Sequence, residues 1–209
     1  MTKLFTPALV DLRAKMSARL LQRLQRGERL AIVGGPKLGK ATLAKQLGVT
    51  QPVRVAAGEQ WPHRADVHLV CADVTHLHHI PAGWTPIPLA PLPKHQVVAK
   101  LSAEAFAATG GHPFLLSAAS SEQLRQRQSL LARAARAYSH RPEWRVLQTL
   151  LAMGGAPAER YARLKRDIPN LKPTLDFLCC AGWVSRAIYG DRAGVEPVPI
   201  FSSPESGAE

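Results

Sequence analysis

The sequence predicts an α/β fold, in which a small parallel sheet flanked by helices is followed by two further parts that are mostly helical. Three observations indicate this order. A short apolar run at residues 30–33 leads through a glycine-rich turn into an amphipathic helix, as at the start of a parallel α/β unit. The composition becomes helical from residue 93, and three helical segments precede a β-hairpin from residue 142. We therefore expect boundaries near residues 92, 140 and 203, before a disordered tail at residues 204–209.

The glycine-rich turn at residues 34–40, Gly-Gly-Pro-Lys-Leu-Gly-Lys, matches the phosphate-binding P-loop pattern except at its last position. Backbone N–H groups of such a loop surround a phosphate, and Lys40 reaches the β- and γ-phosphates. Ala41 replaces the hydroxyl that binds Mg²⁺, and Thr42 lies about 100° further round the helix. A glycine-rich turn of another α/β fold is the alternative. The pattern predicts an ATP or ADP site with impaired Mg²⁺-assisted hydrolysis, formed by Gly34, Gly35, Pro36, Lys37, Gly39, Lys40, Ala41 and Thr42.

Three candidate strands follow this helix, at residues 53–57, 67–72 and 86–89. The last of them is rich in proline and is expected at an edge of the sheet. The second ends at Asp73, where an acid in a P-loop protein holds Mg²⁺ or orients the attacking water. Asp73 is therefore the catalytic candidate, and capping of the next turn is its alternative role. The histidines of this region lack the paired spacing of a zinc site, so we expect no metal and surface positions for His63, His68, His76, His78 and His79.

The first 27 residues predict one amphipathic helix, which begins at Thr6 and Pro7 and ends at Gly27. Its basic residues fall mostly off the apolar stripe, so they predict a solvated face or, alternatively, a partner surface. The formal net charge of the chain is +12. A positive charge of this size favours an anionic partner, which is nucleic acid, an acidic protein or nucleotide. A compositional bias toward arginine explains the charge equally well.

Two features bear on the compartment. No apolar run approaches the ~18 residues that a membrane-spanning helix needs, and no secretory leader is recognisable. The three cysteines, two of them adjacent, form no disulfide framework. We expect a cytoplasmic protein that does not contact membranes.

Helices are expected at residues 94–101, 102–109 and 112–137 in the middle of the chain, and at 143–152, 159–168 and 172–181 after it. Strands are expected at residues 183–189 and 195–201, joined by a turn at 190–194. Three helices and a hairpin in this order describe a winged helix. If it bound DNA, its third helix would enter the major groove. That helix is poor in residues that contact bases, so a structural or regulatory role is favoured. The candidates for contact with nucleic acid are Arg160, Arg163, Lys165, Arg166, Lys172 and Arg192.

The P-loop, the run Thr-Gly-Gly-His-Pro-Phe-Leu-Leu at residues 109–116 and the winged helix occur in one order. In this the chain resembles the STAND branch of the AAA+-like P-loop ATPases over residues 5–203. The resemblance implies a nucleotide domain, a helical lid and a winged helix, with the proline of a Gly-x-Pro element against the adenine. It thereby adds His112 and Pro113 to the expected nucleotide site. Ala41, the lone Asp73 and a span of about 70 residues between Lys40 and Gly111 depart from the family and imply a compact, degenerate member.

We therefore expect a regulatory module that binds ATP or ADP, or has lost binding, with slow or no hydrolysis. It would act as a switch or scaffold for a protein partner in a separate chain, as inactive STAND-like modules do in bacterial conflict and signalling systems. A winged-helix DNA-binding regulator is one alternative. An active ATPase, completed by Thr42 or by a partner, is the other.

Overall fold

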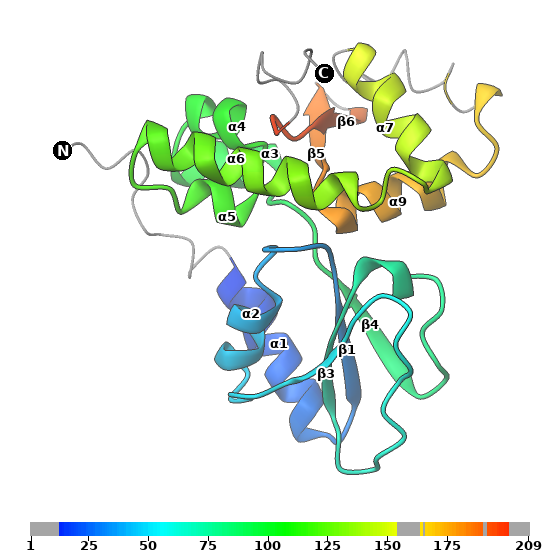
Figure 1. Cartoon of the computed structure of the whole chain (residues 1–209). Coiled ribbons are helices and arrows are strands. Elements are labelled where there is room, and N and C mark those ends of the chain that lie inside the picture. Colours follow the sequence, from blue (N-terminus) through cyan, green and yellow to red (C-terminus); the bar gives the residue numbers. More distant parts are fainter. Residues whose placement is uncertain (1–12, 154–163, 165, 190–191, 201–209) are drawn as a thin grey trace. The chain divides into compact units, whose positions relative to one another are not determined.

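A computed structural model describes residues 13–153, 164, 166–189 and 192–200 of the 209-residue chain (Figure 1). Its contacts divide the described residues into two compact units, one reaching to Leu89 and the other beginning at Ala90. The first unit contains a parallel sheet with helices, and the second contains helices and an antiparallel hairpin. The predicted α/β class with a parallel sheet flanked by helices is confirmed.

The sheet of the first unit has four parallel strands in the order β2-β3-β1-β4. Its strands are β1 (Arg29–Val33), β2 (Val53–Val55), β3 (Leu69–Ala72) and β4 (Trp84–Pro88). The proline-rich strand β4 lies at an edge, as predicted, where the missing N–H groups of Pro86 and Pro88 interrupt no ladder. The other two predicted strands are shorter than expected, by two residues each.

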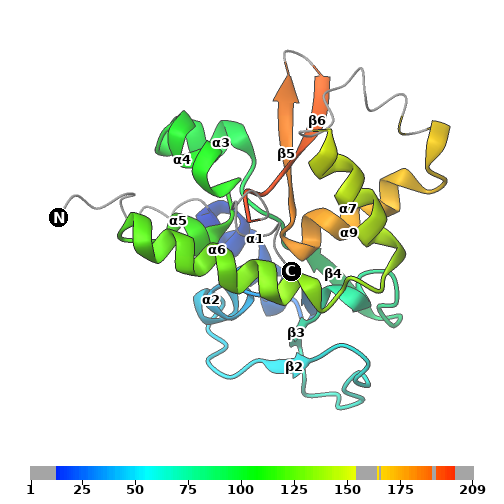
Figure 2. The same ribbon diagram turned by 45° about the horizontal axis from the view of Figure 1, so that its top comes forward.

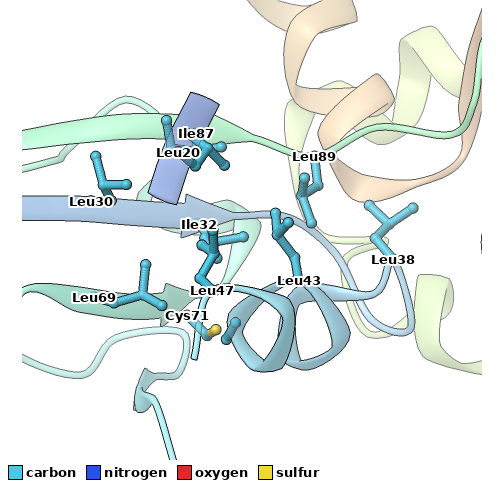
Figure 3. Packing of buried hydrophobic residues seen from close by; sticks show 11 residues of the cluster. Leu20, Leu30, Ile32, Leu38, Leu43, Leu47, Leu69, Cys71, Ile87 and Leu89 are labelled. Atoms are coloured by element: carbon cyan, nitrogen blue, oxygen red, sulfur yellow. The ribbon is translucent and has the colours of Figure 1, made fainter. Parts of the chain in front are cut away.

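Two helices cover one face of this sheet, α1 (Ala14–Gln25) and α2 (Lys40–Gln46). Side chains of β1 alternate between the two faces, so Leu30 and Ile32 join the core beneath the helices. Figure 3 shows this core, which consists of Leu20, Leu30, Ile32, Leu38, Leu43, Ala44, Leu47, Leu69, Cys71, Ile87 and Leu89. The predicted helix start at Thr6 and Pro7 lies outside the described residues.

The opposite face is covered by an aromatic cluster instead of a helix. Trp61 packs at 5.6 Å from the rings of both His76 and Trp84, and the guanidinium of Arg29 lies 4.2 Å from the centre of the Trp84 ring. The prediction that His76 lies at the surface is wrong. His76 is 8% exposed, and its Nε2 lies 2.7 Å from the carbonyl oxygen of Ala56.

The second unit begins with four helices, α3 (Lys94–Lys100), α4 (Ala103–Thr109), α5 (Pro113–Leu116) and α6 (Ser121–Arg136). The helical region predicted over residues 112–137 is present, and it is divided into two separate helices, α5 and α6. The hydroxyl of Ser120 accepts a hydrogen bond from the Gln123 N–H at 3.1 Å and caps α6, so the chain leaves helical geometry before it.

The remaining elements of this unit are α7 (Pro142–Ala152), α9 (Leu171–Ala181), β5 (Val184–Tyr189) and β6 (Arg192–Pro197). Figure 2 shows the paired strands beside α7 and α9. The ring of Trp183 contacts those of Tyr138, Trp144 and Phe177. Strand β6 begins earlier than predicted, because Arg192 pairs with Tyr189. The helix expected at 159–168 falls mostly outside the described residues. No helix of the described chain is long and apolar enough to cross a membrane.

Candidate nucleotide-binding site

The glycine-rich loop connects the carboxyl end of β1 to α2 in the first unit. Gly39 and Lys37 adopt the left-handed region, with φ of 86° and 59°. Leu38 anchors the loop in the core, where it is fully buried beside Leu43 and Leu89 (Figure 3). This anchor holds the remainder of the loop close to the first turn of α2, whose backbone N–H groups have no partners within the helix. The local strand, loop and helix were all predicted from the sequence.

Lys40 folds back over the loop that precedes it. Its Nζ donates a hydrogen bond to the carbonyl oxygen of Gly35 at 2.7 Å and another to that of Gly34. Burial lowers the pKa of the Lys40 ammonium, and the negative charge of Asp73 partly opposes this shift. Among the described residues, no carboxylate forms an ion pair with Lys40. A half-buried cation therefore sits in the loop with neutral oxygens as its hydrogen-bond acceptors.

Asp73 directly follows β3, level with the start of the loop. The register pairs Ala72 with Val33, and the N–H of Gly34 donates to the carbonyl oxygen of Ala72 at 3.3 Å. The Oδ1 atom of Asp73 accepts hydrogen bonds from the backbone N–H and the hydroxyl of Thr75, at 3.0 and 2.9 Å. Asp73 thus caps the 3₁₀ turn η2 (Val74–His76), the alternative role that the sequence analysis gave it.

Arg13 is a residue of this site that the sequence analysis missed. Its Nη1 donates to the carbonyl oxygen of Leu38 at 2.7 Å, and the same nitrogen lies 3.4 Å from the position that a Cβ on Gly39 would take. Burial lowers the pKa of Arg13 to about 10, so the group remains charged at neutral pH. The expectation that this arginine lies on a solvated face is wrong. Arg13 precedes Leu20 by seven residues, two helical turns, which places it in phase with the apolar stripe. That spacing was the available signal.

Ala41 and Thr42 lie in the first turn of α2, and both are exposed. Ala41 has no oxygen to offer a cation. Consecutive helical residues point in directions about 100° apart, so the Thr42 hydroxyl does not take the place that a hydroxyl at position 41 would have. Groups of at least three His, Cys, Asp or Glu residues that could hold a metal are absent from the described part of the chain.

The Gly-His-Pro element belongs to the second unit, whereas the loop belongs to the first. His112 is 1% exposed, and its Nδ1 accepts the N–H of Phe114 at 3.3 Å, which caps α5. Pro113 is the first residue of that helix, as its fixed φ favours. Both residues therefore define how α5 begins.

The two glycines before His112 are required by close backbone contacts. A Cβ on Gly111 would lie 2.0 Å from the carbonyl oxygen of Leu92, and one on Gly110 would lie 2.9 Å from the Cα of Val198. The backbone of Gly111 also accepts a hydrogen bond from the Leu92 N–H at 2.8 Å, and the Ser185 hydroxyl donates to the carbonyl of Gly110. The motif therefore joins the start of the second unit to its β-hairpin.

The structure describes only some of the candidates for contact with nucleic acid. Arg160, Arg163 and Lys165 lie outside the described residues. Arg166 and Lys172 are exposed, and Arg192 is the first residue of β6. The third helix of the expected winged helix, α9, buries most of its side chains, namely Leu171, Leu175, Phe177, Leu178, Cys179, Cys180 and Ala181.

No family model matches this chain, and neither a curated protein nor a solved structure does.

Proposed function

We propose that the chain is a regulatory P-loop module of the STAND-like kind, which binds ATP or ADP through the loop at residues 34–42 and hydrolyses it slowly or not at all. The observation that carries the proposal is the position of Lys40. Its ammonium is half-buried at a glycine loop, with carbonyl oxygens as its hydrogen-bond acceptors. A phosphate would form a direct ion pair with this ammonium, and backbone N–H groups at the start of α2 would hydrogen-bond to its oxygens.

Slow hydrolysis follows from the residues around this loop. Phosphoryl transfer relies on Mg²⁺ to neutralise the developing charge, and the position usually occupied by a metal-binding hydroxyl is Ala41. The carboxylate of Asp73 is engaged with Thr75.

The second unit would act as the part that responds to nucleotide. In this proposal α3–α6 form a helical lid, and the segment from α7 to β6 is a winged helix. The buried face of α9 supports a regulatory role over base recognition, because the side chains of a recognition helix must be free to enter a groove. A partner protein in a separate chain would recognise whether nucleotide is bound, as in a bacterial conflict system. The three free cysteines, all buried, support a reducing, cytoplasmic setting.

Calorimetric titration with ATP and with ADP, each with and without Mg²⁺, tests the proposal. Wild-type protein should bind in the micromolar range, and Lys40→Ala should abolish detectable binding. Lys45→Ala is the matched control, because Lys45 is an exposed lysine on the same helix and its loss changes the net charge equally. The proposal is wrong if the wild type does not bind either nucleotide, or if both variants bind as the wild type does.

A further inference from the structure

Three arginines on the longest described helix, α6, share one exposed face. Arg125, Arg133 and Arg136 are all exposed, and at 100° per residue they fall within an arc of about 80°. Within the described chain none of them has a hydrogen-bond or ion-pair partner. We call these three residues the arginine row. Along the helix axis the row spans about 17 Å, at 1.5 Å per residue.

The remaining arginine of α6 is used differently, which distinguishes the row from a general excess of arginine. Arg127 donates to the carbonyl oxygen of Phe114 at 2.6 Å and to the Ser117 hydroxyl, and its guanidinium lies 4.8 Å from the centre of the Phe114 ring. It therefore joins α6 to α5. The sole acid of α6 is Glu122, in the first turn, where its negative charge interacts favourably with the helix dipole. The sequence contains no acid from residue 123 to residue 142.

We propose that the arginine row binds the phosphate backbone of duplex nucleic acid without preference for base sequence. Guanidinium groups form bidentate hydrogen bonds with phosphate, and a row of this length reaches several phosphates of one strand or spans a groove. Ser129, an exposed residue between the arginines along the helix, adds a hydroxyl that can donate to a phosphate oxygen.

The composition of this face favours a duplex over other anionic partners. Single strands are held by stacking of bases on aromatic rings, and α6 contains no aromatic residue. Amphipathic membrane-binding helices and the buried centres of protein interfaces add apolar contact area to their charge. The apolar side of α6 is used within the fold by Leu124, Leu131 and Ala135, and the exposed face offers one large apolar residue, Leu130, at 54% exposure.

Fluorescence anisotropy with a labelled 20-base-pair DNA duplex, an RNA duplex of the same sequence and a single strand tests the row over a series of salt concentrations. The three contacts should contribute about −3 to the slope of log affinity against log salt concentration. Changing the row to glutamine (Arg125→Gln, Arg133→Gln, Arg136→Gln) should remove that contribution and lower duplex affinity at least about 30-fold at low salt. Equal affinity for both duplexes means recognition of the shared backbone, and a preference identifies which duplex is bound.

The matched control is Arg19→Gln, Arg26→Gln, Arg54→Gln, which removes three exposed arginines of the first unit and the same net charge. Circular dichroism of both triple variants should match the wild type, since exposed substitutions change stability little. The proposal is overturned if wild-type protein binds no duplex at low salt, if it prefers the single strand or an acidic polypeptide to the duplexes, or if the control loses as much affinity as the row variant.

Discussion

Replacement of Gly111 by alanine should destabilise the second unit strongly. The φ of Gly111 is +73°, and the added Cβ would lie 2.0 Å from the oxygen of Leu92. A left-handed conformation costs a residue with a Cβ about 1 kcal/mol. Overpacking against the backbone costs roughly 1–3 kcal/mol, and disruption of the hydrogen bond from Leu92 costs about 1–3 kcal/mol more. We expect a loss of roughly 3–7 kcal/mol, against the roughly 5–15 kcal/mol that is typical of a whole domain.

Gly58→Ala separates the backbone term from the steric one. Gly58 has a φ of +78°, and nothing lies within 4 Å of the position of its added Cβ, so this variant should lose only about 1 kcal/mol. Urea unfolding, followed by circular dichroism and by tryptophan fluorescence, measures both variants. Trp144 and Trp183 lie in the second unit and Trp61 and Trp84 in the first, so the fluorescence reports the unfolding of both units. A loss for Gly111→Ala no larger than that for Gly58→Ala would refute the steric reasoning.

Arg13→Gln loses a charged hydrogen bond to the loop, so nucleotide affinity measured by calorimetry should fall about tenfold. Arg19→Gln should leave the affinity unchanged, and equal affinities of the two variants would contradict the positioning role of Arg13. Ala41→Ser restores the hydroxyl, so Mg²⁺ should then raise nucleotide affinity and turnover, and an unchanged Mg²⁺ response would show that this position does not limit the site. Burial raises the pKa of Cys179 to about 11 and that of Cys180 to about 12. Above pH 9 both thiols ionise in the unfolded chain before they do so in the fold, so the free energy of unfolding should fall by up to about 1.4 kcal/mol per pH unit per thiol. Urea unfolding at pH 8 and 10 measures this loss, and a Cys179→Ala, Cys180→Ala variant with an equally steep loss would contradict it.

Much of the first unit could be predicted from the sequence because its signals are local. The apolar run of β1, the glycine-rich turn and the helix that follows lie within 19 consecutive residues, Arg29 to Leu47, and each is recognisable from its own composition. The edge position of β4 was also predictable, since Pro86 and Pro88 cannot donate to a central ladder. The break between α5 and α6 was missed because Ser117, Ala118 and Ala119 are compatible with a helix. Only the cap that Ser120 forms for α6 marks the interruption.

Local patterns in the sequence were sufficient to predict the parallel α/β class and the phosphate-loop pattern with its missing hydroxyl. These depend on periodicity, on the conformational freedom of glycine and on the missing N–H of proline, which act over a few neighbouring residues. The contact of Arg13 with the loop, the burial of His76 against Trp61 and the hydrogen bond from Leu92 to Gly111 could not be predicted in this way. Each of these contacts joins residues at least 15 positions apart, and their partners are chosen by packing, which no local pattern encodes.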